Sequence, residues 1–170
     1  VGDRSAYKNF DKAVEVVKNF DDMHLVVIGG KSFSDQELLL LSELDDRFFS
    51  FKGVSSNDLN WLYNKAFCLL YPSSYEGFGI PLLEAMKAGC PVVSTNLSSI
   101  PEVAGDAVLL VDEITSTAFT KKIMSLFDSD VRAGLIEKGY TQASKFSWDK
   151  CYTETMEFYD VVLDWHFGEN

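Results

Sequence analysis

Two glutamates in one short stretch have the most informative spacing in this chain. Glu76 and Glu84 lie within residues 71–95, which read YPSSYEGFGIPLLEAMKAGCPVVST. A carboxylate has acceptor sites for hydrogen bonds from neighbouring hydroxyl groups. The spacing therefore points to a site for a polyol, with Glu84 near the vicinal hydroxyls of one sugar and Glu76 facing a second one.

The residues between and after the glutamates predict a turn that leads into a helix. Gly77 and Gly79 permit backbone conformations that are closed to other residues. Pro81 suits the first turn of a helix, and Gly89 suits the left-handed position that ends one. The predicted helix runs from about Ile80 to Ala88. Its unpaired N–H groups and positive dipole end would form a seat for a phosphate.

Short apolar runs alternate with helical patterns, and they predict the elements that position this turn. The predicted strands are Leu25–Ile28, Phe48–Phe51, Phe67–Tyr71, Pro91–Ser94 and Ala107–Val111. Such alternation indicates a parallel sheet covered on both faces. The predicted fold class is therefore α/β, a Rossmann-like doubly wound parallel sheet with a helical C-terminal tail. Ligands bind at the carboxyl ends of the strands in such sheets, which is where the two glutamates fall.

Apolar spacing and capping residues predict the helices. A helix beginning near Phe10 has its apolar residues on one face, Ser34 with Glu37 forms a capping box, and Ser56 caps the next helix. Helices are also predicted near 115–127, 130–145 and 148–165.

Composition excludes several classes of function. The chain has 170 residues, 46% of them hydrophobic, which suits one folded domain. A formal net charge of −11 opposes nucleic-acid binding, which needs clustered Lys and Arg. No apolar run approaches the roughly 20 residues of a membrane span. The chain has neither a P-loop nor a G-x-S-x-G elbow, and position 82 lacks the glycine of a dinucleotide fingerprint.

The cysteines and histidines predict no metal site. Cys68, Cys90 and Cys151 are far apart and odd in number, which predicts free thiols in a reducing compartment. The two histidines, His24 and His166, have no partner at a ligand spacing. We therefore expect neither a cofactor nor a metal requirement.

The segment EGFGIPLLE resembles the E-x7-E signature of retaining glycosyltransferases of family 4, which have the GT-B fold. The surrounding residues 71–112 and the opening residues VGDR and YKNF also resemble this family. The resemblance implies that residues 1–170 form a single donor-binding domain, the C-terminal half of a GT-B fold. The N-terminal acceptor domain would be missing from this chain, and the final helix would cross back to it.

The resemblance also implies roles for single residues. Arg4 and Lys8 would hold the donor diphosphate and stabilise the leaving group, so that no metal is needed. Glu84 would bind the ribose, and Glu76 would lie at the hexose near the reacting carbon. Without the resemblance, charged residues at such positions are usually solvated surface residues. The other implied donor-binding residues are Gly2, the loop of Lys52, Gly53 and Val54 for the nucleobase, and Gly77, Phe78, Gly79 and Ile80.

The predicted function is retaining transfer of a hexosyl unit from a nucleotide diphosphate sugar to a growing glycan or lipid-linked saccharide. The YKNF opening favours GDP-mannose, and a UDP-hexose is also open. The alternatives are a GT-B-fold UDP-N-acetylglucosamine 2-epimerase and a non-catalytic nucleotide-sugar-binding module. We expect a cytoplasmic location, with any membrane contact made through the missing domain. Val1–Gly2 is predicted to be the tail of a first, central strand whose body lies outside the chain.

Overall fold

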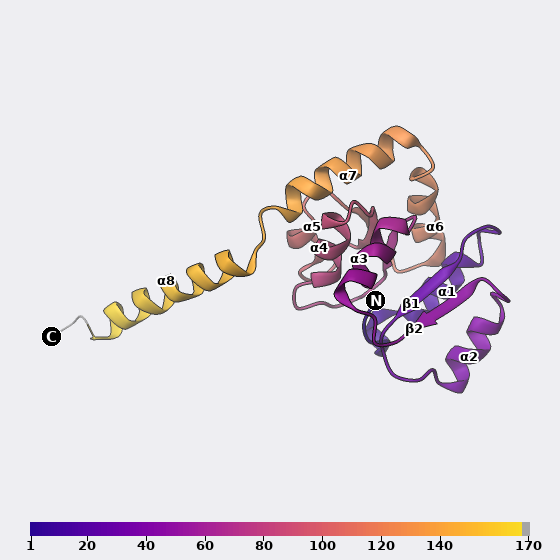
Figure 1. Ribbon diagram of the computed structural model, residues 1–170, viewed down its shortest axis with the longest axis horizontal. Coiled ribbons are helices and arrows are strands. Elements are labelled where there is room, and N and C mark those ends of the chain that lie inside the picture. Colours follow the sequence, from indigo (N-terminus) through magenta and orange to yellow (C-terminus); the bar gives the residue numbers. More distant parts are fainter. Residues whose placement is uncertain (168–170) are drawn as a thin grey trace.

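Helices and short strands alternate along residues 1–167, the part of the chain that the computed structural model describes (Figure 1). The last three residues of the predicted domain lie outside it. The strands are β1 (Leu25–Ile28), β2 (Phe48–Phe51), β3 (Leu69–Tyr71), β4 (Val92–Thr95) and β5 (Leu109–Val111). The helices are η1 (Ala6–Lys8), α1 (Phe10–Val17), α2 (Asp35–Ser42), α3 (Ser56–Lys65), α4 (Ile80–Lys87), α5 (Ile100–Ala104), α6 (Ser116–Ser125), α7 (Ser129–Ala143) and α8 (Trp148–Phe167).

The strands form two parallel sheets instead of one continuous sheet. One sheet pairs β1 with β2, and the other has the order β3-β4-β5. Every pairing is parallel, with Leu25 opposite Phe48 and Leu69 opposite Val92. The predicted α/β class is thus confirmed, and the sheet is divided between β1 and β3.

The predicted strand tail at Val1–Gly2 does not form a strand. The backbone N–H of Gly2 donates to the carbonyl of Ile28 at 2.8 Å, so this segment does lie beside β1. One such bond does not make a ladder, because strand pairing needs successive residues that bond to a neighbour.

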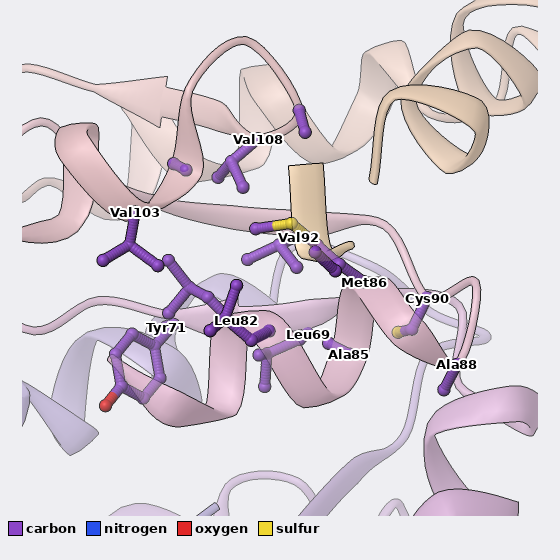
Figure 2. Packing of buried hydrophobic residues seen from close by; sticks show 14 of the residues in the cluster. Leu69, Tyr71, Leu82, Ala85, Met86, Ala88, Cys90, Val92, Val103 and Val108 are labelled. Atoms are coloured by element: carbon purple, nitrogen blue, oxygen red, sulfur yellow. The ribbon is translucent and has the colours of Figure 1, made fainter. Parts of the chain in front are cut away.

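The main core lies between α4 and the β3-β4-β5 sheet (Figure 2). β4 is buried along its whole length, as expected of a central strand covered on both faces. Leu82 and Met86 of α4 point into this core together with Val92, and each is at most 2% exposed. The helix that begins at the glycine turn is therefore anchored over a tightly packed layer.

Helix caps follow the predictions with one exception. The Ser34 hydroxyl and the Glu37 carboxylate form the predicted capping box at the start of α2. The prediction that Ser56 caps α3 was wrong, because Ser55 holds that position and its hydroxyl accepts from Asp58 N–H. Two adjacent serines cannot be told apart by pattern, and only Ser55 has the extended backbone of an N-cap.

The C-terminal part is helical, as predicted. α6 and α7 pack against the domain, and α8 extends away from it (Figure 1). Aromatic side chains on α8 are exposed, with Trp148 at 78% and Trp165 at 79%. Among residues 1–167, none of the helices has both the length and the apolar character that a membrane span requires.

Candidate functional site

The glycine turn lies between the carboxyl end of β3 and the first turn of α4, where the sequence predicts it. Gly79 is the N-cap of α4 with φ of 100°, a conformation that favours glycine. Pro81 occupies the first turn, and Gly89 ends the helix with φ of 70°. Gly77 does not have a positive φ, and nothing lies within 4 Å of the position that a Cβ would take there. The space beside Gly77 is therefore empty of protein atoms, which leaves the turn open to a ligand.

Two serines that sequence reasoning missed hold this turn in place. The Ser98 and Ser99 hydroxyls donate to the carbonyl of Glu76 at 2.7 and 2.9 Å. The backbone N–H of Glu76 donates back to the Ser98 hydroxyl at 2.8 Å. Ser98 itself has φ of 53°, a left-handed backbone that is uncommon outside glycine. The two adjacent serines before α5 were the feature of the sequence that could have indicated these contacts.

Lys8 and Glu76 are brought together although they lie far apart in the sequence. The Lys8 ammonium donates to Glu76 Oε1 at 2.5 Å and to the Tyr71 hydroxyl at 3.1 Å. Both charged side chains are largely buried, at 16% and 10% exposure. A partly buried ion pair of this kind is far less screened than one on the surface. The structure therefore joins two of the predicted site residues into one charged unit.

This pairing shifts the pKa values of its members. Burial raises the pKa of Glu76, but the hydrogen bond from the Lys8 ammonium and its positive charge outweigh burial and leave the pKa below its usual 4.5. Burial lowers the pKa of Lys8, but its bonds to Glu76 and Tyr71 leave the pKa above its usual 10.5. Burial, and then the neighbouring Glu76, raises the pKa of Tyr71 to about 12. At neutral pH the unit thus contains an ammonium, a carboxylate and a neutral phenol.

The loop that carries Lys8 is fastened to the end of β3. The Asn9 side chain donates to the carbonyl of Pro72 at 2.8 Å, and Ser74 N–H donates to the carbonyl of Tyr7 at the same distance. Asn9 has φ of 49°, a left-handed conformation that asparagine tolerates better than most residues. These contacts fix the position of the Lys8 ammonium relative to Glu76.

Glu84 lies in the second turn of α4 beside a buried tyrosine. The Tyr63 hydroxyl, on α3, donates to Glu84 Oε2 at 3.1 Å. Tyr63 is only 4% exposed, and burial, followed by the nearby Glu84 charge, raises its pKa far above the usual value. Its hydroxyl therefore stays protonated and holds one oxygen of the half-buried carboxylate. The sequence gave no sign of this contact, because Tyr63 lies among apolar residues of α3 and far along the chain from Glu84.

Arg4 does not join this cluster. Its guanidinium donates to Glu37 Oε1 at 2.8 Å and to the carbonyl of Lys31 at 2.6 Å, and it stacks 3.9 Å from the centroid of Phe33. The Arg4 side chain is only 7% exposed. Gly30, at φ of 77°, makes room for it, because a Cβ there would collide with the guanidinium. The Arg4 side chain is therefore held within the fold, and it is not the solvated surface residue that its type alone suggested.

The remaining predicted residues lie in the loop after β2 and at the glycine turn after β3. Lys52 and Gly53 are exposed in the loop after β2, and Gly53 has φ of 64°. Val54 is half-buried there. Phe78 and Ile80, at 43% and 45% exposure, face solvent beside the glycine turn. All of them follow the carboxyl ends of parallel strands, where open α/β sheets commonly bind ligands.

The described part of the chain shows no grouping of metal ligands. Within residues 1–167, no three His, Cys, Asp or Glu side chains lie close enough together to hold an ion. The groups at the site are instead a cation, two carboxylates, phenolic hydroxyls and the N–H groups of a helix start. These can bind an anion and several sugar hydroxyls at once.

The fold and this site define a parallel α/β domain whose candidate site lies at the carboxyl ends of its strands. The family described as glycosyl transferases group 1 matches residues 1–142, and the chain belongs to that family. O-antigen chain mannosyltransferase B from Escherichia coli is 40% identical over 142 residues, which are 81% of this chain and 37% of the relative. O-antigen chain mannosyltransferase RfbU from Salmonella typhimurium is 34% identical over 136 residues, 76% of this chain and 38% of that protein. The chain therefore spans less than two fifths of these relatives.

Solved structures share the fold. The C-terminal domain of a glycosyl transferase group 1 family protein, LpcC, from Francisella tularensis superimposes with a TM-score of 0.74 at 26% identity, covering 85% of this chain and 82% of that one. The Anabaena protein HepE, crystallised with UDP-glucose, has a TM-score of 0.81 at 18% identity, covering 94% of this chain and 48% of that one. The second likeness concerns the fold alone.

Proposed function

We propose that this chain is the donor-binding part of a hexosyltransferase that uses a nucleotide diphosphate sugar and retains the configuration of the sugar. The observation that carries the proposal is the pair of carboxylates held at the glycine turn, with Lys8 bonded to Glu76. Glu84 lies in α4, close to the helix start, and Glu76 lies in the turn. A ligand that spans both must present two groups of hydroxyls on either side of an anion, as a nucleotide diphosphate sugar does.

Lys8 is the cation we assign to the diphosphate. Its ammonium donates a hydrogen bond to the Glu76 carboxylate, which neutralises its charge. When a diphosphate binds, the ammonium can turn to the phosphate oxygens while Glu76 accepts a hydroxyl of the hexose. The Lys8–Glu76 contact thus marks the junction between diphosphate and hexose, where the bond breaks. Positive charge there offsets the charge that develops on the leaving group.

Glu84 is assigned to the ribose. Tyr63 holds one carboxylate oxygen, which leaves the other to accept from the ribose hydroxyls. Backbone N–H groups of Phe78, Gly79 and Ile80 complete the donor site, and the loop of Lys52, Gly53 and Val54 is assigned to the nucleobase, with Gly2 near the diphosphate. The diphosphate role predicted for Arg4 requires its guanidinium to leave Glu37, and it stays a prediction.

The mannosyltransferase relatives favour a mannosyl donor and an O-antigen glycan as the acceptor, and the YKNF opening favours GDP as the nucleotide of that donor. Because the chain spans only part of these relatives, we assign the acceptor site to the remainder of the full-length protein, and the exposed aromatic face of α8 to contact with it. The full-length protein would act in the cytoplasm, with any membrane contact made by that remainder. No divalent metal is needed in this scheme.

Calorimetric titration of this chain tests the proposal. We expect GDP, UDP or both to bind in the presence of EDTA, the corresponding nucleoside to bind more weakly, and no hexose to be transferred by this chain alone.

Glu84→Ala should weaken nucleoside diphosphate binding by about 1–3 kcal/mol, the cost of losing a charged hydrogen-bond partner. Glu76→Ala should change nucleotide affinity little and reduce turnover of the full-length enzyme. Equal losses of nucleotide affinity in both variants would contradict the assignment.

A further inference from the structure

One buried hydroxyl beside the glycine turn has no hydrogen-bond partner. Ser73 lies in the loop after β3, three residues before Glu76, and is 1% exposed. Among residues 1–167, its Oγ is the one buried side-chain oxygen or nitrogen that neither donates nor accepts a hydrogen bond. Buried polar groups are nearly always paired, because an unpaired one keeps the cost of leaving water. The position of this hydroxyl therefore calls for an explanation other than packing.

The backbone around Ser73 is fixed, so the unpaired hydroxyl does not result from a loose loop. Thr95 Oγ1, at the end of β4, donates to the carbonyl of Ser73 at 2.5 Å. The adjacent Ser94 hydroxyl donates to the carbonyl of Tyr71 at 2.7 Å. Ser94 and Thr95 are themselves completely buried. Ser73 is therefore held in place by its backbone, and the freedom that remains to its Oγ is rotation between side-chain rotamers.

The Ser73 side chain lies next to the Lys8–Glu76 ion pair. Lys8, Tyr71 and Ser73 line the same cavity. Burial raises the pKa of Glu76, whereas Lys8 and then the Ser73 hydroxyl lower it, so Ser73 is close to the carboxylate. The two side chains nevertheless form no hydrogen bond in this arrangement. Lys8 holds the carboxylate instead, and Ser73 is a neighbour that has a hydrogen to donate.

The Tyr71 hydroxyl is a second possible donor to Glu76. The Tyr71 ring packs in the main core, and its hydroxyl points out of that cluster (Figure 2). One atom, Lys8 Nζ, donates both to this hydroxyl and to Glu76 Oε1, so the phenol also lies near the carboxylate. A hydroxyl that accepts one hydrogen bond still has its own hydrogen to donate.

Diphosphate binding, as proposed above, takes the Lys8 ammonium away from Glu76. The Glu76 side chain is only 10% exposed, and a largely buried carboxylate without donors is costly. An ionised carboxylate has two oxygens and about four acceptor sites. Glu76 can therefore accept from Ser73, from Tyr71 and from a hexose hydroxyl at the same time.

We propose that Ser73 is a positioning residue, which takes over the Glu76 carboxylate by donating a hydrogen bond to it when Lys8 turns to the diphosphate. The inference rests on the proposed function, because it requires that movement of Lys8. The Tyr71 hydroxyl, which Lys8 also leaves, supplies a second donor. Glu76 thus keeps its charge and its place beside the hexose. Because the Ser73 hydroxyl is unpaired before the exchange and paired after it, the exchange favours the ligand-bound state.

A double-mutant cycle in calorimetric titrations tests this inference on the present chain, in EDTA and with GDP or UDP, whichever the wild type binds more tightly. We expect Ser73→Ala to bind that nucleotide about three- to tenfold more weakly, the effect of one lost hydrogen bond. In the Glu76→Gln background no carboxylate needs the new donor, and Ser73→Ala should change the affinity by less than about twofold.

The outcomes of the cycle separate this inference from the proposed function. A loss of the same size in both backgrounds, or no loss in either, would overturn the role of Ser73 while the proposed function stands. If the wild type bound neither nucleotide, the proposed function would fail and the inference would fall with it.

Urea unfolding of the free protein distinguishes this role from a structural one. Ser73→Ala should keep the wild-type urea midpoint or raise it, because the hydroxyl that it removes has no partner. The matched control is Ser94→Ala, which removes an equally buried hydroxyl that holds the Tyr71 carbonyl and should lower the midpoint. A midpoint for Ser73→Ala as low as that of Ser94→Ala would show that Ser73 serves the fold, and it would overturn the inference.

Discussion

Replacing Arg4 by methionine should destabilise the fold, although the residue carries a charge and lies in a loop. The guanidinium bonds to the Glu37 carboxylate and to the carbonyl of Lys31, and it stacks on the ring of Phe33. With 7% of the side chain exposed, solvent screens these contacts little. Methionine keeps most of the apolar stem, so the loss is confined to the charged head.

The structure sets the size of this loss. Leaving the partly buried Glu37 carboxylate without its cation costs about 1.5–3 kcal/mol, and losing the cation–π contact costs about 0.5–1 kcal/mol. The expected total is about 2–4 kcal/mol. For a domain of this length, each kcal/mol lowers Tm by roughly 2–4 °C, so Tm should fall by about 4–16 °C.

Thermal and urea unfolding followed by circular dichroism measure the effect. A double-mutant cycle with Glu37→Gln isolates the ion pair, because glutamine still supplies the N3 side chain of the capping box with Ser34. The matched control is Lys138→Ala, which breaks an exposed ion pair with Asp106 and should change stability by less than about 1 kcal/mol. If Arg4→Met kept the wild-type Tm but lost nucleoside diphosphate affinity, the guanidinium would serve the ligand and our reading of its contacts would be refuted.

Three further results are expected. Tyr63→Phe should weaken nucleoside diphosphate binding by about three- to tenfold in calorimetry, because Glu84 loses the donor that orients it, and an unchanged affinity would count against that role. The Glu76 pKa is lowered in the folded state, so its bond to Lys8 stabilises the fold above pH 4.5, and this stability is lost as pH falls through the lowered pKa. The urea midpoints of wild type and Glu76→Gln should therefore converge in acid. A difference between the two midpoints that stays constant with pH would contradict this. The exposed thiol of Cys151 should react with a thiol reagent at pH 8 well before the other two cysteines, whose pKa values burial raises, and equal rates would contradict the packing.

Much of the fold could be predicted because the signals were local. β1 and β2 begin and end at the predicted residues, since each is a short apolar run bounded by turn residues. The turn at Gly79 and the end of α4 at Gly89 were predicted correctly because a left-handed backbone favours glycine. The short helix α5 was missed, since five residues give too little periodicity to detect.

The arrangement of the site depended on contacts that no local pattern encodes. The Lys8–Glu76 bond joins residues 68 positions apart, and the Tyr63–Glu84 bond joins two helices. The division of the strands into two sheets was also not predicted, because it depends on which strand edges form hydrogen bonds with a neighbouring strand. Arg4 was misjudged because its environment is set by Glu37 and by the open space at Gly30, both distant in sequence.

The measurement that tests the central claim most directly is a calorimetric comparison of nucleoside diphosphate binding in two charge-removing variants. Glu84→Gln removes the carboxylate assigned to the ribose, and Glu102→Gln removes an exposed acidic residue from the first turn of the neighbouring helix α5. We predict that, in EDTA, wild type and Glu102→Gln bind the nucleoside diphosphate equally and Glu84→Gln binds about 5- to 150-fold more weakly, which corresponds to about 1–3 kcal/mol. Equal affinity in all three proteins, or no binding by the wild type, would contradict the assignment of a donor site to this turn.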